Sequence, residues 1–464
     1  MALSGVKAAI HAAEAYLDTD AIPWKRIAVT LLCAVELLEM YLMLRQCRMY
    51  SVTTPPKVFE KHVSDEDFRK SQRYGSDMTR LLLLQKALGC MTRLGIILYN
   101  VDAHMWVAST ALLRRLGVTP GEVMTTVVYA NILSLIWVPQ SIFMRAFEQW
   151  VVQAQRGSGM QSWLAFIVDT AKGLALGIVL SPLYALLIPI VRWTGDGFVA
   201  YAVLCYAAIS VTGSVIYPTL IQPLFTSLTP LPDCPLRDRI AVLAEQVHLP
   251  LEGVYVIEES SRSRPSNAYV EGMWGRSQRI VLTDTLFQQL SPAEIEALLA
   301  QELGHWTYSH GAKMAAIELL YPALTLCGFT LFFKNAAMFR AFGFGPHAVA
   351  RVPYLPVLVG YHLFNMLLEP LHTMLGPVIN AVSRRFEFEA DRFAVALSRP
   401  GPIFAQHEDA DGSYAELLKR ALLRLQIHER PTTHHDPLYS AYFHPAPTLP
   451  ERWDAIDRMQ HKSQ

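Results

Sequence analysis

Long apolar stretches constrain the fold of this chain more than any other feature. About seven of them approach the ~20 residues that an α-helix needs to cross a bilayer. They cover residues 27–44, 81–101, 123–145, 161–191, 196–224, 314–334 and 351–381. Of the 464 residues, 52% are hydrophobic and only 17% are charged, which departs from the composition of ordinary soluble proteins. The sequence therefore predicts a mainly α-helical, polytopic membrane protein of about seven transmembrane helices.

Several predicted spans carry ionisable side chains, which are costly in lipid unless they pair with one another or face water. These residues are Glu36, Glu39, Asp169, Lys172, Glu318, His362 and Glu369. Together they favour a helical bundle that encloses a hydrated chamber. Pairing between helices that only specifies packing is the alternative for each residue taken singly, and the sequence leaves it open.

Charge and cysteine content argue against several functions. The 40 basic and 40 acidic residues give a formal net charge of zero, so there is no electrostatic case for a nucleic-acid partner. The six cysteines form no Cys-x-x-Cys pair, which indicates neither a disulfide framework nor a thiolate metal site. Residues 1–23 lack the pattern of a cleavable signal, so we expect the first span to act as a signal anchor. Basic residues flank that span on both sides, which leaves its orientation open.

Polar segments divide the chain into four parts. Residues 1–225 contain about five of the spans, with a polar loop at 49–80 that we expect to include a short amphipathic helix. Residues 226–313 form the main soluble segment, 314–381 contain two further spans, and 382–464 complete the soluble part. The two soluble segments are far apart in sequence, so they must meet in space to build one site.

One short motif in the soluble part indicates a chemistry. Residues Gln301-Glu302-Leu-Gly-His305 match the helix motif of zinc proteases at every position but the first, where a histidine is expected. Residues four apart share a helix face, so side chains 301 and 305 can converge on one metal ion, while Glu302 faces the catalytic water as a general base. Upstream, the residues from Ser291 to Glu294 predict a capping box with proline at the first helical position. We therefore expect the motif on an ordered amphipathic helix.

A second segment completes the predicted metal site. Glu387 is the candidate third ligand, and Asp391, one turn further, is placed to orient a ligand. Zinc prefers nitrogen and sulfur donors, so the amide of Gln301 is a poor replacement for an imidazole and metal affinity should fall. The amide oxygen could still face the metal while the NH₂ group donates to Asp391. His310 is a second candidate substitute, although its offset of five residues from His305 predicts a different helix face.

The segment that precedes the motif helix predicts a small β-sheet. Residues 253–257 and 279–283 are short β-branched runs, and residues 266–270 form a third candidate strand. An edge strand beside a zinc helix can hold an extended peptide by strand addition, which would give Asn267 a role in binding substrate. A role for Asn267 as a turn-former is an equal alternative.

Taken together, these features resemble the type I CAAX prenyl proteases, which are integral-membrane zinc metalloendopeptidases with a gluzincin-like catalytic domain. The resemblance extends from about residue 25 to about residue 455. Beyond the order of the spans, it rests on Tyr41-Leu-Met-Leu-Arg45-Gln46, Glu66-Asp-Phe-Arg-Lys-Ser-Gln-Arg-Tyr74, Gln222-Pro-Leu-Phe225, Ser266-Asn-Ala-Tyr269, Glu302-Leu-Gly-His-Trp306 and Ser383-Arg-Arg-Phe-Glu387-Phe-Glu-Ala-Asp391. It implies a location in endoplasmic reticulum and nuclear membranes and a chamber closed at one end by the catalytic domain. The implied substrate is a protein ending in a prenylated cysteine and three further residues, which the enzyme removes.

The resemblance also assigns roles to individual residues. By this resemblance, Glu302 would be the general base, and His305 and Glu387 would be ligands of a single zinc ion, with Gln301 at the remaining ligand position. Asp391 would be a partner of the ligands, and Asn267 would contact the substrate backbone. Near the C-terminus the family has a His-Pro step before a Leu-x-Glu-Arg helix start. The register without a gap places Ala446 at that histidine position, whereas a shifted loop would bring His444 to the oxyanion.

Three hypotheses about function follow. The first is a prenyl-protein endopeptidase with weakened zinc binding, and the retained Glu302, His305, Glu387 and Asp391 support it. The second is a pseudoprotease of the same fold that binds prenylated or membrane-stalled chains without cutting them, and Gln301 and Ala446 support it. The third is a polytopic transporter or channel, which the polar spans permit. We expect a monomer that contacts the lipid bilayer.

Overall fold

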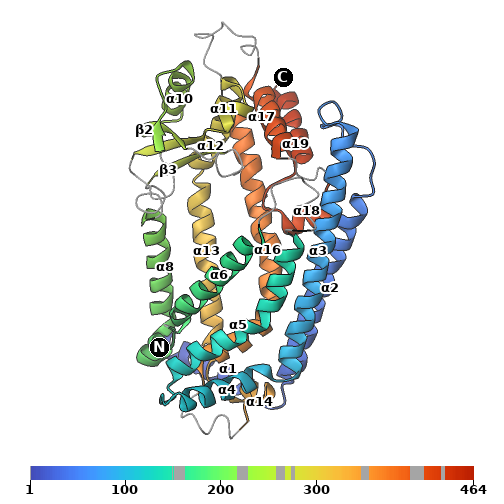
Figure 1. Ribbon diagram of the computed structural model, residues 1–464. Coiled ribbons are helices and arrows are strands. Elements are labelled where there is room, and N and C mark those ends of the chain that lie inside the picture. Colours follow the sequence, from blue (N-terminus) through green and yellow to red (C-terminus); the bar gives the residue numbers. More distant parts are fainter. Residues whose placement is uncertain are drawn as a thin grey trace. The chain divides into compact units, whose positions relative to one another are not determined.

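The computed structural model describes residues 2–148, 150, 162–185, 187–216, 228–257, 267–272, 277–345, 355–397, 412–429 and 434–463. The chain divides into two compact units (Figure 1). Unit 1 comprises Met1–Cys47, Ser76–Ala207 and Leu319–Leu375, and unit 2 comprises Arg48–Gly75, Ala208–Glu318 and Gly376–Gln464. All candidate residues of the predicted active site, from Asn267 to His444, belong to unit 2.

Helices account for most of the described residues, as predicted. Those up to the sheet are α1 (Ala2–Leu17), α2 (Trp24–Met49), α3 (Asp65–Leu98), α4 (Val101–Arg115), α5 (Glu122–Phe147), α6 (Trp163–Tyr184), α7 (Leu187–Thr194) and α8 (Phe198–Ile216). Those beyond it are α10 (Pro235–Gln246), α11 (Leu286–Gln289), α12 (Pro292–Thr307), α13 (His310–Phe329), α14 (Ala336–Ala341), α16 (Val357–Ala396), α17 (Tyr414–Glu429), α18 (Pro437–Phe443) and α19 (Leu449–Ser463).

Four helices among the described residues are long and apolar enough to cross a membrane, namely α2, α3, α5 and α13. The fourth predicted span differs from expectation, because it contains two helices, α6 and α7, instead of one. Proline removes a backbone donor and clashes with the preceding turn, and Pro182 stands in the last turn of α6. The fifth predicted span is helical to Ile216, and its remainder, with the motif at 222–225, lies outside the described residues.

Two helices are longer than the sequence pattern predicted. The prediction of a short amphipathic helix within the polar loop at 49–80 is wrong, because residues 65–80 form the first turns of the 34-residue helix α3. Ser64 caps this helix by accepting a bond from the Asp67 amide, and three acidic residues in the first turn suit the helix dipole. Helix α16 has 40 residues, so the end of the last apolar stretch and Glu387 lie on one continuous helix.

Unit 1 holds its helices together with apolar cores and with ion pairs. Trp24 and Leu32 of α2 pack with Trp106 of α4 in one cluster of buried side chains. Arg93 of α3 pairs with Glu36 of α2 and with Glu369 of α16. Several of the predicted polar span residues therefore pair between helices, which is the alternative that the sequence left open, and the hydrated chamber stays a prediction.

Unit 2 contains a mixed sheet of four strands, β1 (Leu228–Pro230), β2 (Leu251–Ile257), β3 (Ala268–Gly272) and β4 (Gln278–Thr283), in the order β1-β2-β4-β3. Strands β2 and β4 are parallel, and the two outer strands run antiparallel to their neighbours. The three predicted strands are confirmed within a few residues, and the short β1 was not predicted.

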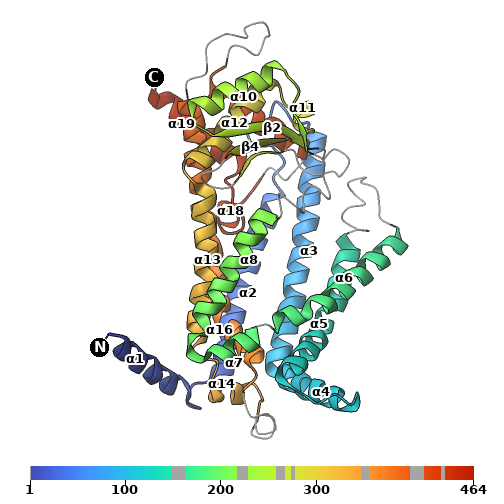
Figure 2. The same ribbon diagram turned by 90° about the vertical axis from the view of Figure 1, so that its left-hand side faces the viewer.

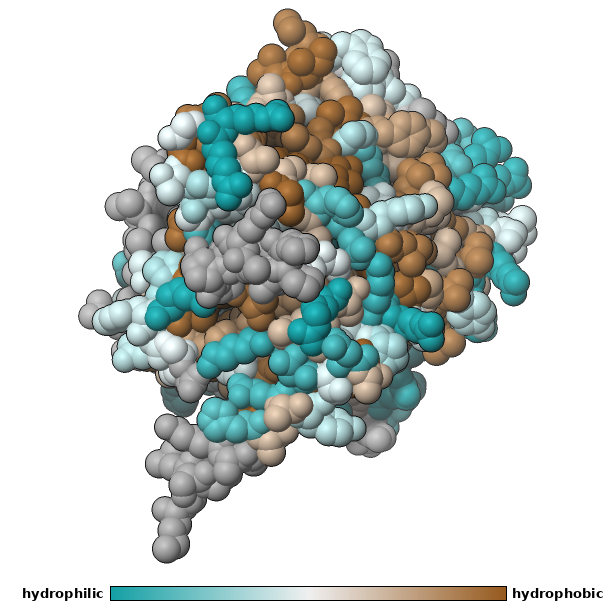
Figure 3. All heavy atoms as spheres, turned by 90° about the horizontal axis from the view of Figure 1, so that it is seen from below, coloured by the Kyte–Doolittle hydropathy of each residue, from teal (hydrophilic) through white to brown (hydrophobic). Residues whose placement is uncertain are grey.

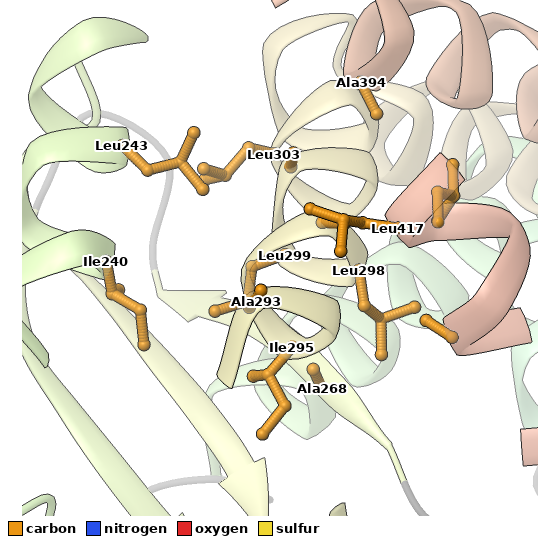
Figure 4. Close-up of a cluster of buried hydrophobic side chains, with 14 of the residues drawn as sticks. Ile240, Leu243, Ala268, Ala293, Ile295, Leu298, Leu299, Leu303, Ala394 and Leu417 are labelled. Carbon is orange, nitrogen blue, oxygen red and sulfur yellow. The ribbon is translucent and has the colours of Figure 1, made fainter. Parts of the chain in front are cut away.

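Apolar side chains alternate along the strands and form the main core of unit 2. Val254, Ile280 and Leu282 point to the face that carries α10 and α12 (Figure 2), because side chains of a strand alternate between faces. Ile240 and Leu243 of α10 approach the motif helix there, and Ala394 of α16 and Leu417 of α17 pack around it (Figure 4). The motif helix is thereby fixed at the centre of a packed core.

Candidate active site

Helix α12 begins as the sequence predicts. The Ser291 side chain accepts a bond from the Glu294 amide at 3.4 Å, and the Glu294 carboxylate accepts one from the Ser291 amide at 2.8 Å. This capping box and the proline at the first helical position fix where the helix starts, and hence the face on which residues 301 and 305 lie.

Gly304 lets α12 approach α16 closely. A Cβ atom at this position would stand 3.1 Å from the Ala390 Cα and 3.1 Å from the Phe393 Cβ. Only a glycine allows this separation without moving a neighbour, since most Cβ contacts are longer. The close approach brings the motif residues of α12 beside Glu387, which precedes Ala390 by one turn.

Gln301, His305 and Glu387 converge. The Gln301 Nε2 atom lies 2.9 Å from His305 Nε2 and 3.3 Å from Glu387 Oε2, and His305 Nε2 lies 3.5 Å from Glu387 Oε1. Gln301 is buried, whereas the side chains of His305 and Glu387 are 24% and 22% exposed. Three predicted ligand positions therefore meet at one point that ligands or substrate can reach.

These separations allow a test of whether a zinc ion fits. Ligand atoms about 2.0–2.2 Å from a tetrahedral zinc stand roughly 3.4 Å apart, which matches the 3.5 Å separation between His305 Nε2 and Glu387 Oε1. An imidazole nitrogen and a carboxylate oxygen are ordinary zinc donors. The amide of Gln301 stands at the third ligand position. It can bind the ion only when its oxygen atom faces it, and that oxygen is a weak ligand for zinc. The residues thus fit zinc, with one weak corner.

The described residues contain no group of three or more histidine, cysteine, aspartate or glutamate side chains arranged to hold a metal ion. The cluster at the candidate site contains two such side chains, His305 and Glu387, and its third member is the amide of Gln301. The expected bond from the Gln301 NH₂ group to Asp391 is replaced by the contacts with His305 and Glu387.

Glu302 stands next to this cluster and is half-buried. Burial raises the pKa of its carboxyl to about 7, and the negative charge of Glu387 adds to the effect, whereas His305 and Arg452 act in the opposite direction. A carboxyl group with a pKa near 7 can both accept and return a proton near neutral pH, which is the property required of a general base.

Arg452 is the residue at this site that sequence analysis missed. Its guanidinium donates two bonds to Asp391, at 2.9 Å and 2.5 Å, and its NH1 atom lies 3.4 Å from Glu387 Oε2. Asp391 is fully buried. Burial opposes ionisation of Glu387, but its hydrogen bond with His305 and the charge of Arg452 lower the pKa of Glu387 below the ordinary value. The Leu-x-Glu-Arg pattern in the sequence includes Arg452, but it does not indicate that Arg452 bonds to Asp391.

His310 returns to the site, contrary to the expectation of a different helix face. Helix α12 ends at Thr307, Ser309 adopts φ 54°, and the resulting turn places His310 Nδ1 3.1 Å from His305 Nδ1. His310 Nε2 lies 3.3 Å from Glu389 Oε2. When His305 is neutral, a donor at Gln301 leaves its Nε2 atom as acceptor, so His305 donates through Nδ1 to His310, which donates to Glu389; protonated His305 instead donates through Nε2 to Glu387. This chain of bonds keeps the Nε2 lone pair of His305 facing the cluster.

The electrostatics of the cluster favour a positive charge. Burial alone would lower the pKa of His305, but the hydrogen bond with Glu387 and the charges of Glu387 and Glu302 raise it above the ordinary value. The same negative field that favours a proton on His305 favours a cation bound between His305 and Glu387.

Asn267 and His444 lie in unit 2, outside this bonded cluster. Asn267 precedes the edge strand β3, and its side-chain oxygen accepts a bond from the Ala268 amide at 2.9 Å. His444 ends α18 and its ring contacts those of His435 and Tyr439. The Ala446 carbonyl accepts a bond from Arg384 at 3.2 Å. Their catalytic roles stay predictions.

Comparison with known proteins identifies the family. Residues 46–227 match the family described as CAAX prenyl protease N-terminal, five membrane helices, and residues 230–460 match peptidase family M48. The chain is 34% identical to the CAAX prenyl protease 1 homolog of Arabidopsis thaliana, over 96% of this chain and 100% of that one. It is 31% identical to CAAX prenyl protease 1 of Saccharomyces cerevisiae, over 96% and 98%. The crystal structure of S. mikatae Ste24p matches with a TM-score of 0.78 and 30% identity, over 94% of this chain and 99% of that one.

The chain belongs to the CAAX prenyl proteases of peptidase family M48. The predicted family, the fold class and the class of enzyme, a metalloendopeptidase embedded in a membrane by several helices, are thereby confirmed. Zinc follows from the family, whose metallopeptidases are zinc-dependent. The division into four segments along the chain and the roles of single residues remain predictions.

Proposed function

We propose that this chain is a zinc metalloendopeptidase that removes the C-terminal tripeptide from prenylated CAAX proteins, with its metal affinity lowered by Gln301. The observation that carries the proposal is the convergence of His305, Glu387 and Gln301 within 3.5 Å of one another beside Glu302. The names of the relatives support the substrate class, because those proteins are CAAX prenyl proteases.

In this proposal His305 and Glu387 hold the zinc ion, and the Gln301 amide oxygen fills the third position. When bound, zinc supplies Lewis acidity that polarises the scissile carbonyl. Glu302 takes a proton from the attacking water and passes it to the leaving amine, so the peptide bond breaks with no net gain or loss of protons. Arg452 positions Glu387 and Asp391 through the contacts described above.

Substrate would reach this site as an extended chain. Strand β3 is an edge strand, so its outer backbone groups are available to pair with a peptide, and Asn267 at its start would contact the substrate backbone. His444 would stabilise the oxyanion from the loop after α18. A prenylated cysteine suits a membrane-embedded protease because the lipid chain partitions into the bilayer. We place the protein in the endoplasmic reticulum membrane, where it acts as a monomer.

A pseudoprotease is the second candidate, and Gln301 favours it. The amide nitrogen lies between His305 and Glu387, so the side chain satisfies both groups in the absence of an ion. A transporter accounts for neither the family match nor this cluster.

Zinc content and turnover, measured together, test the proposal. We would purify the wild-type chain and Gln301→His, determine bound zinc by atomic absorption after dialysis, and measure hydrolysis of a farnesylated CAAX peptide. Loss of an outer-sphere partner costs 10–100-fold in metal affinity, so restoring a ligand should tighten zinc binding by on the order of 100-fold or more. We expect partial zinc occupancy and slow turnover in the wild type, and gains in both for Gln301→His.

Two controls sharpen the experiment. Glu302→Gln should retain the zinc of its parent and lose turnover, and Gln288→His should change neither, since Gln288 is exposed on the neighbouring helix α11. Wild-type protein without zinc or turnover, both restored by Gln301→His, would establish the pseudoprotease. A Gln301→His variant that binds no more zinc than the wild type would refute the assigned metal site.

A further inference from the structure

A second site lies in unit 1, which contains none of the peptidase residues. A cavity of about 680 Å³ opens beside the first turn of α2, and the residues lining it come from the α1–α2 connection, from α2, from the end of α3 and from α14. Three of them are basic, namely Lys25, Arg26 and Arg340, and one is acidic, Asp20. The cavity therefore has an excess of positive charge at one end of a helix that is long and apolar enough to cross a membrane.

The basic side chains are held in place by neighbouring groups. The Lys25 ammonium donates to the Leu98 carbonyl at 3.0 Å and to Asn100 Oδ1 at 2.8 Å, which leaves one of its three donors for another acceptor. Arg340 pairs with Asp20 at 3.0 Å, but both side chains are well exposed, at 44% and 73%. Such an exposed pair is weak and can exchange its carboxylate for a competing anion.

A buried donor in the cavity wall has no partner. Trp24 lines the cavity and is only 6% exposed, and among the described residues no group accepts a hydrogen bond from its indole Nε1. The Nε1 atom itself is shielded from solvent, so the indole contributes apolar ring surface to the cavity wall and no donor. Trp24 also begins the 26-residue helix α2, whose first amides lack intrahelical acceptors and carry the positive end of the helix dipole.

The remaining wall of the cavity is apolar. Ile22, Val29, Ala337 and Ala341 contribute hydrocarbon surface beside the basic groups. The side of unit 1 that carries α4 and α14 in Figure 1 shows hydrophilic side chains set among hydrophobic ones when seen from below (Figure 3). Tryptophan, lysine and arginine at the end of an apolar helix are typical of the boundary between lipid and water.

From these observations we infer that the cavity binds the headgroup of an anionic phospholipid. The phosphate lies against Arg26, Arg340 and the free donor of Lys25. The apolar wall takes the first carbons of the acyl chains. Basic pockets between transmembrane helices at a membrane surface bind anionic headgroups in this manner. The apolar wall is the reason for assigning a lipid and not a soluble phosphate.

Native mass spectrometry of the full chain tests this assignment. Protein in nanodiscs would be transferred to detergent with equal amounts of phosphatidylglycerol and phosphatidylcholine of matched acyl chains, and the retained lipids counted. We expect phosphatidylglycerol to be retained in preference. Each basic residue near a membrane surface changes binding by about fivefold, so Arg26→Gln and Arg340→Gln should each reduce that preference by about this factor.

A charge change in the opposite direction makes the test sharper. Asp20→Asn removes the competing carboxylate and should increase retention of phosphatidylglycerol. Arg115→Gln is the matched control, because Arg115 is an exposed arginine on α4 that does not line the cavity.

The proposal is overturned if the two lipids are retained equally, or if Arg26→Gln and Arg340→Gln behave like Arg115→Gln. Displacement of phosphatidylglycerol by millimolar glycerol phosphate alone would also overturn it, because the site would then recognise a free phosphate. None of these outcomes depends on zinc or on peptide hydrolysis.

Discussion

At the scale of the residue, one guanidinium organises the charges of the candidate active site. Arg452 donates to the buried Asp391 and lies 3.4 Å from Glu387. Burial would oppose the charge on Arg452, but Asp391 and the nearby glutamates raise its pKa, so it stays cationic. Removal of one partner from such a buried pair costs more free energy than the intact pair contributes to stability, because the other charge remains buried without a partner.

Arg452→Gln is therefore expected to destabilise the protein by roughly 3–5 kcal/mol. Arg452→Lys should recover part of that loss, because it restores the charge but not the two parallel bonds of the guanidinium. Unfolding in detergent, followed by circular dichroism, would measure both changes. The exposed Arg458 on the same helix provides the control, and Arg458→Gln should stay within about 0.5 kcal/mol of the wild type. Equal stability of the Arg452 and Arg458 variants would contradict this view.

At the scale of the element, the contact between α12 and α16 sets the distance between the metal-binding positions. Gly304 faces Ala390 and Phe393 across that contact, and the two helices carry His305 and Glu387. A Cβ atom at position 304 would have to push the backbone of α16 away, because its neighbour at 3.1 Å is the Ala390 Cα and not the end of a flexible side chain.

Gly304→Ala should destabilise the protein by about 1–3 kcal/mol and weaken zinc binding as His305 and Glu387 separate. Gly311→Ala is the matched control on α13, since a Cβ there meets no atom within 4 Å. It should be neutral or stabilising by up to about 1 kcal/mol, because alanine loses less entropy in a helix. Thermal unfolding and zinc titration of both variants would measure the difference. Loss of zinc affinity in both, or in neither, would rule out the close approach as the cause.

The start of α19 illustrates a second effect at this scale. The Glu451 carboxylate accepts bonds from the Thr448 amide at 2.7 Å, from the Thr448 hydroxyl at 2.9 Å and from Arg384 at 2.7 Å. Burial would raise the pKa of Glu451, but the hydrogen bonds from Thr448 and the charge of Arg384 lower it below the ordinary value of 4.5.

A carboxyl group with a lowered pKa in the folded state stabilises the protein above its ordinary value and loses that contribution as the pH falls through the lowered value. Glu451→Gln should therefore lower the unfolding temperature at neutral pH and flatten its decline below about pH 5. Unfolding temperatures across this pH range would measure the effect, with the exposed Glu245→Gln of α10 as control. A decline as steep in Glu451→Gln as in the wild type would show that other groups dominate.

At the scale of the whole molecule, ionisable side chains join helices that are distant in sequence. In unit 1, Arg93 of α3 pairs with Glu36 of α2 and Glu369 of α16, and Lys86 lies 3.5 Å from Glu36. The Glu36 side chain is only 2% exposed. Such charges in apolar spans are costly without partners, so their pairing specifies which helices are neighbours.

Arg93→Met should destabilise the protein by roughly 3–5 kcal/mol, because Lys86 is then the one ion-pair partner of Glu36 within the described part of the chain. The double variant Glu36→Gln with Arg93→Met should recover part of the loss, since Glu36 then carries no charge, while Glu369 still lacks the partner that Arg93 provided. Thermal unfolding in detergent would measure this double-mutant cycle, with Arg80→Met at an exposed position of α3 as control. Additive effects of the two substitutions would mean that Glu36 and Arg93 do not stabilise each other.

The sequence predicted those features that a short stretch of neighbouring residues encodes. Apolar runs predicted the helical membrane class, alternation of β-branched residues predicted three of the strands, and the Ser291 capping box predicted the start of α12. The placement of Gln301 and His305 on one helix face followed from the motif, because residues four apart on a helix share a face. These features depend on backbone geometry over short distances.

Only the tertiary structure revealed the contacts that depend on how distant segments pack. Arg452 meets Asp391 across 61 positions of sequence, and His310 returns to His305 because the helix ends and turns at Ser309. The continuity of α3 and α16 through polar residues was equally hidden, since a hydropathy pattern marks where lipid can solvate a helix and not where its hydrogen bonds stop. A local pattern fixes which face of a helix a side chain occupies, whereas the partner on that face is chosen by the packing of the whole unit.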